Sequence, residues 1–304
     1  MIPKRVAAVV VTYNRLDLLK ECLAALLNQS VVCDVVLINN NSTDKTEEYI
    51  KELSNPKILY YNTGENLGGA GGFAYGIEKA IQMNYDYIWI MDDDSIADRD
   101  GLKSLLDKAE KLDNNFSFLC SMVLWTNKKA CIMNIPAYDF TSNFNYEFLL
   151  KDRLLPIASC SFVGCFVNMR IAEKEALPIK EFFIYGDDIE YTKRLKKHND
   201  AYLDTDSIIV HKTKNNAGTN IVYADQSNLQ RYIYAYRNGM YTARQYGAKS
   251  VMKRLNKVRK KIGEVLKSKT TYKCKKVVVI ITGTIKGMFF NPKLVYVRNR
   301  ANEN

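Results

Sequence analysis

Three consecutive aspartates, Asp92, Asp93 and Asp94, follow a mostly apolar segment at 85–91. Side chains alternate in direction along an extended chain, so Asp92 and Asp94 can point the same way. Such a carboxylate pair is typical of a binding site for a hard divalent ion, Mg²⁺ or Mn²⁺, which phosphate oxygens also coordinate. The competing interpretation is an acidic turn that caps the next helix. The triplet is therefore the first candidate for metal and phosphate chemistry.

Polar residues also follow three other apolar segments. They form the stretches 12–15 (TYNR), 39–44 (NNNSTD) and 64–72 (GENLGGAGG), beside 92–95 (DDDS). In open α/β sheets, ligands bind at the carboxyl ends of the strands. Four polar strand ends therefore predict one shared ligand site.

The segment 66–73 (NLGGAGGF) holds four glycines within five residues, Gly68, Gly69, Gly71 and Gly72. Glycine is disfavoured inside helices and strands, so the segment is expected to be a loop whose bare backbone something approaches closely. A dinucleotide fingerprint also fits the letters, but that fingerprint opens the first strand–helix turn, whereas this segment follows the third strand. A flexible turn before a helix is the other interpretation.

These motifs need a scaffold, and the hydrophobic pattern supplies one. Strands are predicted at 6–13, 34–40, 57–62 and 85–94, with helices at 16–29, 42–53 and 74–83 between them and a later helix at 188–198. This alternation predicts an α/β fold with a mostly parallel sheet flanked by helices. After about residue 222 the pattern turns helical, so we divide the chain into 1–221 and a basic helical region, 222–304.

The charge is concentrated in the second region. Residues 250–304 hold fifteen Lys/Arg and two Asp/Glu, so they carry +13 and the rest of the chain −2. Seven cysteines without a C-x-x-C pair indicate reduced thiols in a cytoplasmic protein. The longest apolar run, 277–290, is shorter than the roughly 20 residues that a membrane-spanning helix needs.

The chain resembles the family 2 glycosyltransferases of GT-A fold over about residues 5–240, because five motifs occur in that family's order. They are VVVTYNR, INNNSTD, NLGGAGGF, MDDD and YGDDIEY. The glycine-rich motif is most similar to that of the bacterial galactofuranosyltransferases. Related rhamnosyltransferases share much of this pattern.

The resemblance implies roles for the strand-end residues. The nucleotide-sugar donor would be held by Thr12, Asn14, Arg15, Asn39, Asn40, Asn66, Gly68, Gly69, Gly71, Gly72, Asp92 and Asp93. Many relatives have an aspartate, which contacts uracil, where this chain has Asn39 or Asn40; an amide can still pair with the ring. Mn²⁺ or Mg²⁺ would be bound by Asp92, Asp94 and His211. A histidine after a strand can equally be structural.

The last of these motifs supplies the expected base. Inverting sugar transfer needs a carboxylate that accepts the proton of the acceptor hydroxyl, and the family pattern places it at Asp188, with Asp187 as the neighbouring candidate. Nearby carboxylates would raise its pKa. The alternative is that these acids only cap the helix that follows.

The implied reaction is transfer of galactofuranose from UDP-galactofuranose to a lipid-linked surface polysaccharide, by an enzyme peripheral on the inner face of the membrane. The alternatives are rhamnose transfer from a dTDP donor, or a non-catalytic nucleotide- or glycan-binding module. An apolar stripe lies among the cations of the second region and consists of Val251, Leu255, Val258, Ile262 and Leu266. This pattern predicts a helix on a membrane surface rather than a helix that binds nucleic acid. The segment 232–241 either helps to form the acceptor site or is an ordinary helix, and an oligomer is compatible with the sequence.

Overall fold

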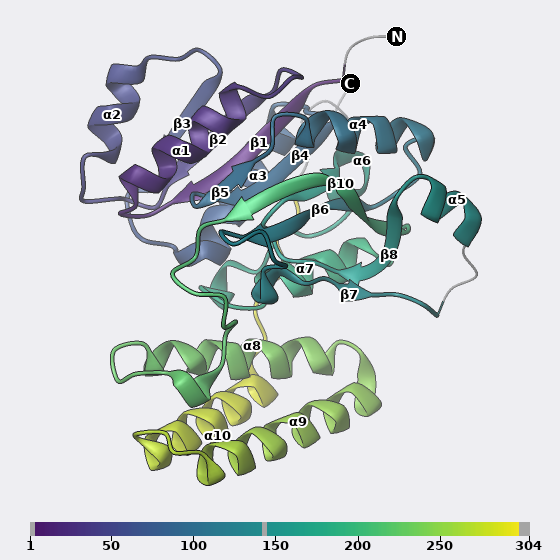
Figure 1. The fold of residues 1–304 in the computed structure, drawn as a ribbon. Coiled ribbons are helices and arrows are strands. Elements are labelled where there is room, and N and C mark those ends of the chain that lie inside the picture. The colour runs from purple at the N-terminus through teal and green to yellow at the C-terminus, as the bar shows by residue number, and fades with distance from the viewer. Residues whose placement is uncertain (1–3, 142–144, 298–304) are drawn as a thin grey trace.

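The computed structural model describes residues 4–141 and 145–297, and it is built on one 10-stranded sheet (Figure 1). The order across the sheet is β3 (Ile58–Asn62), β2 (Asp34–Asn39), β1 (Val6–Thr12), β4 (Tyr87–Asp92), β9 (Cys165–Asn168), β6 (Phe118–Trp125), β10 (Ala201–His211), β8 (Leu154–Ser159) and β7 (Ala137–Tyr138), with β5 (Ser95–Ala97) paired to β10. The first four of these strands are parallel. The predicted alternation of strands and helices in this half is confirmed.

Helices cover both faces of the sheet. One face carries α1 (Leu16–Leu27), α2 (Thr46–Leu53), α4 (Gly101–Lys111) and α5 (Tyr146–Lys151), and the other carries α3 (Gly68–Gln82), α6 (Met169–Ala172) and α7 (Asp187–Leu195). Along β1, Val6, Ala8 and Val10 pack in the hydrophobic core on the side of α1, while the residues between them pack in the core on the side of α3. A strand buried on both faces reads as a continuous apolar run, which is the pattern at 6–11.

The glycine-rich segment differs from the prediction, because it is the first part of α3 and not a loop. A Cβ atom on Gly72 would lie 2.6 Å from Val11 Cγ1, and one on Gly76 would lie 2.5 Å from Val9 Cγ1. These glycines let α3 approach β1 more closely than any side chain would allow. The sequence could not distinguish this close packing from the approach of a ligand.

The other strands complete the sheet, and the longest of them, β10, positions a distant histidine. Strand β10 runs parallel to β6, and its last residues pair with β5, so that His211 lies opposite Ser95. Because β5 follows directly after the aspartate triplet, this pairing places His211 beside Asp94.

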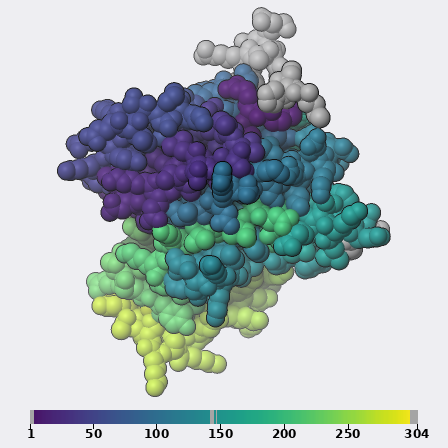
Figure 2. Space-filling model, turned by 45° about the horizontal axis from the view of Figure 1, so that its top comes forward, coloured from purple at the N-terminus to yellow at the C-terminus, as the bar shows by residue number. Residues whose placement is uncertain are grey.

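The region after residue 222 forms a layer of three helices below the sheet domain: α8 (Tyr232–Arg244), α9 (Gly247–Lys267) and α10 (Lys273–Phe289) (Figure 1). The Asn238 amide on α8 donates hydrogen bonds to the carbonyl oxygens of Phe182, Ile184 and Tyr185, which attaches the layer to the sheet domain. Figure 2 shows these helices at the opposite end of the molecule from the N-terminal segments. The chain then returns, and Leu177 donates to the carbonyl of Val295 at 2.8 Å.

The apolar stripe of α9 does not face outward as the membrane prediction required. Val258 and Val265 are buried against α8 and α10, and Ile262 packs beside them, so only Leu266 of the predicted stripe is exposed. The outward apolar face belongs to α10, where Val278, Ile281, Ile285, Met288 and Phe289 are exposed. Among the described residues, no helix is both long and apolar enough to cross a bilayer.

Candidate active site

The aspartate triplet and His211 form a compact group at the carboxyl end of β4. Asp92 ends that strand, and Asp93 and Asp94 form the turn into β5. One ligand atom from each of Asp92, Asp94 and His211 lies within 4.8 Å of the others. The structure therefore brings together the three residues expected to bind a metal ion.

His211 is fixed from both sides of its ring. Its Nδ1 lies 2.8 Å from the amide oxygen of Asn134, and its Nε2 lies 2.9 Å from Asp94 Oδ1. An amide oxygen only accepts, so Nδ1 donates to it, and Nε2 faces the carboxylates. Burial disfavours the charged ring, but the hydrogen bond to Asp94 and the carboxylate charges outweigh it and raise the pKa of His211.

Asp93 points away from this group toward β1 and α1. Its carboxylate accepts from Thr12 Oγ1 at 2.7 Å and from Arg15 Nη1 at 3.2 Å, and the same guanidinium nitrogen lies 2.9 Å from Asp94 Oδ2. Burial raises the pKa of Asp93 to about 7, although Arg15 and Thr12 oppose that rise. Arg15, which is half exposed, is thus a counter-ion of both Asp93 and Asp94.

The asparagines of the strand ends join the neighbouring loops. Asn14 Oδ1 accepts from the Thr43 amide at 2.7 Å, and Asn39 Oδ1 accepts from the Ser42 amide at 2.8 Å. Asn40 Nδ2 donates to the carbonyl of Gly68 at 2.9 Å, whereas its buried Oδ1 has no hydrogen-bond partner among the described residues. The predicted convergence of the strand ends is therefore visible as a connected network, and donor contact by these asparagines stays a prediction.

Three of the four glycines face protein atoms. Cβ atoms built on Gly68, Gly71 and Gly72 would meet Phe183, Leu67 and Val11, respectively. Gly68 has a φ of +70°, and its amide donates to Asn66 Oδ1 at 2.9 Å. Gly69 alone of the four has open space around it and lines the cavity described below. Packing accounts for the other three without a ligand, and their contact with the donor stays a prediction.

The acids of the YGDDIEY motif begin α7 directly after Gly186, which has a φ of +85°. Asp188 Oδ1 accepts from the Ile189 amide at 2.7 Å, and burial raises the pKa of Asp188 to about 6. Burial and the adjacent charge of Asp188 hold the pKa of Asp187 well above its usual range. Of the two carboxyl groups, Asp187 therefore has the stronger tendency to keep its proton. This difference favours Asp188 as the base.

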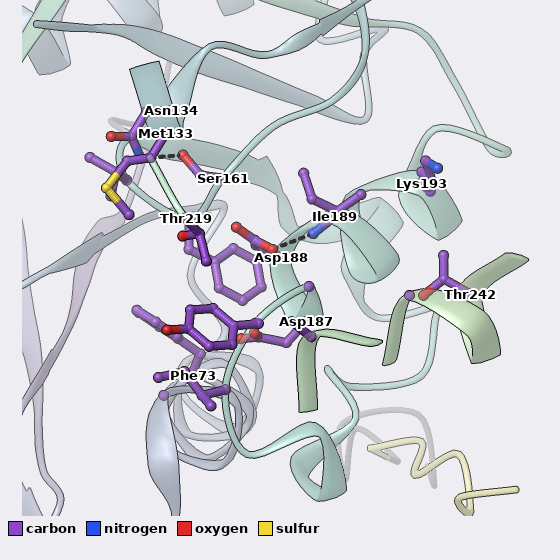
Figure 3. A pocket seen from close by; sticks show the side chains of 18 of the residues that line it. Phe73, Met133, Asn134, Ser161, Asp187, Asp188, Ile189, Lys193, Thr219 and Thr242 are labelled. Atoms are coloured by element: carbon purple, nitrogen blue, oxygen red, sulfur yellow. Dashed lines mark hydrogen bonds between the residues drawn. The ribbon is translucent and has the colours of Figure 1, made fainter. Parts of the chain in front are cut away.

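A cavity of about 840 Å³ joins these groups. Its lining includes Arg15, Gly69, Asp92, Asp94, His211, Asp187, Asp188, Lys193, Thr242, Lys253, Arg254 and Lys257. One end holds Asp94 and His211, because His211 contacts both Asp94 and Asn134. The other end holds Lys193 together with Lys253 and Lys257, whose charges lower the pKa of Lys193. Figure 3 shows Asp188 at the centre, with Asn134 on one side and Lys193 and Thr242 on the other. The volume is typical of small-molecule sites.

Several lining residues could not be identified from the sequence. Asn134, which holds His211, comes from the short 3-10 helix Ile132–Asn134, 77 residues away in the chain. The cations of α9 resemble an ordinary solvent-exposed helix face. No motif marks either group, because each is assembled only by the tertiary fold.

Comparison with known proteins gives a consistent result. A family model for glycosyl transferase family 2 matches residues 7–175. The chain is 27% identical over 199 residues to galactofuranosyltransferase GlfT1 of Mycolicibacterium smegmatis, a match that covers 62% of this chain. It covers 65% of that relative, just under two thirds of its length.

Among solved structures, S. aureus TarS 1-349 aligns with a TM-score of 0.55 at 14% identity and covers 94% of this chain and 91% of that one. The structure of GalNAc-T7 with UDP, GalNAc and Mn²⁺ aligns with a TM-score of 0.56 at 14% identity, covering 83% of this chain and 54% of that one. The expected GT-A fold is confirmed by these neighbours.

Proposed function

Because the chain belongs to glycosyl transferase family 2, we propose that it is a metal-dependent inverting glycosyltransferase that uses a nucleoside diphosphate sugar. The observation that carries this proposal is the single cavity in which Asp92, Asp94 and His211 lie at one end and Asp188 lies at the centre. A non-catalytic binding module would not need a base between its two ends.

The three ligand side chains fit Mn²⁺ or Mg²⁺ in their chemistry. Carboxylate oxygens suit both ions, and the hydrogen bond from Nδ1 to Asn134 leaves Nε2 of His211 directed at the carboxylates. An ion bound there would stabilise the departing diphosphate by charge. Arg15 pairs with Asp93 and Asp94 and lines the same cavity, so it would contact donor phosphates if a bound ion neutralised those carboxylates.

Asp188 performs the proton transfer in the proposed reaction. Its carboxylate accepts the proton of the acceptor hydroxyl while that oxygen forms a bond to the anomeric carbon, and the bond from this carbon to the diphosphate breaks. The nucleoside diphosphate leaves with the bonding electron pair. Attack from the side opposite the leaving group inverts the anomeric centre, which agrees with the position of Asp188 between the two ends of the cavity.

We propose UDP-galactofuranose as the donor and a lipid-linked glycan as the acceptor. The support is the similarity to galactofuranosyltransferase GlfT1 together with the glycine-rich segment at 66–73. The alternative donor is dTDP-rhamnose.

The enzyme would act at an anionic membrane surface, through α10 rather than through the stripe predicted on α9. The exposed apolar residues of α10 lie beside Lys275 and Lys286, and the part of the chain after residue 250 is strongly cationic. Apolar side chains flanked by lysines are the usual composition of a helix that lies on an anionic bilayer.

A donor hydrolysis screen tests the enzymatic proposal. Purified protein is incubated with UDP-galactofuranose, UDP-galactopyranose or dTDP-rhamnose, with Mn²⁺, with Mg²⁺, or with excess EDTA, and release of the nucleoside diphosphate is measured. We expect release from UDP-galactofuranose that requires the metal ion and is lost in Asp94→Asn. Preferential hydrolysis of dTDP-rhamnose would identify it as the donor instead of UDP-galactofuranose. Full release of the nucleoside diphosphate in EDTA would exclude a role for the metal ion.

A further inference from the structure

The end of the cavity farthest from the aspartate triplet is cationic. Lys253, Arg254 and Lys257 lie on one face of α9 by their spacing, and Lys193 faces them from α7. All four line the same cavity as Asp188. We call this group the cationic end.

The lysines of the cationic end lack anionic partners within the protein. Among residues 4–141 and 145–297, Lys193, Lys253 and Lys257 make no ion pair or hydrogen bond, although other lysines nearby do, such as Lys261 with Glu264. The Lys193 ammonium lies 5.4 Å from the centre of the Tyr246 ring. Burial and then the charges of Lys257 and Lys253 lower the pKa of Lys193.

Arg254 is held in a recess that α8 leaves open. A Cβ atom on Gly239 would lie 2.4 Å from Arg254 Nη2, so only glycine permits the guanidinium to occupy that place. Nη2 donates to the carbonyl of Ala235 at 3.0 Å, while the buried Nε has no hydrogen-bond partner among the described residues. A buried donor without a partner is costly, so an acceptor atom placed beside Nε would stabilise Arg254.

The two ends of the cavity have opposite charge, and Asp188 lies between them. In the proposed reaction the donor diphosphate occupies the end with Asp92 and Asp94, where an ion would compensate the carboxylates. The acceptor hydroxyl must approach Asp188 from the other side, so the acceptor occupies the cationic end. A neutral glycan gains little from four positive charges, whereas phosphate oxygens pair well with lysine and arginine.

We propose that the cationic end binds a phosphate or diphosphate group carried by the acceptor. The inference rests on the proposed transferase function, because it assigns the two ends of one cavity to two substrates. The phosphate would place the acceptor by its charge, while the sugar it carries presents a hydroxyl to Asp188.

The test uses the full chain in EDTA, where no metal ion at Asp92 and Asp94 attracts an anion to that end of the cavity. Geranyl diphosphate and inorganic diphosphate are titrated calorimetrically into the wild type, into Lys257→Glu and into Arg259→Glu. Arg259 is an exposed cation on α9 outside the cavity, so its substitution changes the net charge equally. We expect saturable binding of geranyl diphosphate that weakens roughly tenfold or more in Lys257→Glu only.

The two anions identify the source of the phosphate. Tighter binding of geranyl diphosphate than of inorganic diphosphate supports a lipid-linked acceptor, and equal binding supports a phosphate within the glycan itself. No saturable binding by the wild type up to millimolar anion, or equal losses in both variants, would overturn the proposal.

A second readout separates this proposal from the function on which it rests. Binding of UDP with Mn²⁺ is measured in the same proteins and should remain unchanged in Lys257→Glu. If that variant loses UDP as strongly as geranyl diphosphate, the cationic end holds the donor and the inference is wrong. Absence of donor hydrolysis by the wild type would instead contradict the transferase proposal alone.

Discussion

Arg15 and His211 hold the acidic residues at the carboxyl end of β4. Arg15 bridges Asp93 and Asp94, and His211 contacts Asp94 from the other side. Buried carboxylates require such compensation, because isolated charges are strongly disfavoured away from water. The residues that would bind a metal ion are thus already in place, and the ion would replace part of an existing charge balance.

We expect Asp188→Asn to reduce turnover by roughly 10²–10⁴, because the amide keeps the shape of the side chain but cannot accept a proton. Asp187→Asn should be milder, because burial and the charge of Asp188 favour the protonated form of Asp187, which an amide resembles. The measurement is the rate of glycosyl transfer, with UDP affinity as the control for folding. A crippled Asp187→Asn beside an active Asp188→Asn would reverse the assignment.

The raised pKa of Asp188, about 6, also predicts a pH dependence. A base acts only when deprotonated, so its contribution is complete above the pKa and is lost as the pH falls below it. The rate should therefore be level near neutral pH and fall about tenfold per pH unit below about 6. A rate that stays constant down to pH 5 would show that another group accepts the proton.

At the level of secondary structure, α3 is the element that the sequence described least well. Helix propensity disfavours a start with four glycines, so the segment was expected to be a loop. Packing overrides propensity here, since Gly72 and Gly76 allow the helix to contact β1. Apolar periodicity predicted the strands β1 to β4 and the helices between them apart from α3. The antiparallel strands after residue 116 depend instead on long-range pairing that no local pattern encodes.

Two glycines in α3 should respond oppositely to substitution by alanine. Gly72→Ala should destabilise the protein by about 1–3 kcal/mol, because the added Cβ atom overlaps Val11. Gly69→Ala should leave the free energy of unfolding unchanged or raise it by about 0.4–1 kcal/mol, because the added Cβ atom meets open space within a helix. Its added methyl group faces the cavity and should raise the Michaelis constant for the donor.

Thermal melts and donor kinetics of both α3 variants test this expectation. If Gly69→Ala kept donor affinity while folding normally, the glycine-rich segment would serve packing alone. If Gly72→Ala melted like the wild type, the close contact between α3 and β1 would not be required for stability.

Considered as a whole, the molecule combines a sheet domain with a helical layer that forms part of the cavity. The sequence predicted a helical, basic stretch after residue 222, and α8, α9 and α10 lie there. It did not predict that the apolar stripe of α9 packs inside the layer, because an amphipathic pattern indicates which residues share a face and not which partner covers that face. We therefore propose α10, and not α9, as the membrane-facing helix.

We expect Ile285→Asp to weaken binding to vesicles that contain phosphatidylglycerol by about tenfold or more, because it places a charge in the exposed apolar face of α10. Val32→Asp is the matched control, since Val32 is 67% exposed in the sheet domain. Cosedimentation with anionic and with neutral vesicles provides the measurement. Equal binding by both variants and the wild type would exclude α10 as the membrane contact.

Helix α8 contributes both to the cavity and to the core of the helical layer. Thr242 and Gly239 line the cavity, while Tyr232 packs in that core. This has a consequence for making hybrid enzymes. Exchange of α9 and α10 with those of a relative, joined after α8, would replace Lys253, Arg254 and Lys257 and leave the donor end intact. Such hybrids should inherit donor choice from the first parent and acceptor choice from the second. A junction placed at 221/222 would instead move one whole wall of the cavity, together with its attachment through Asn238.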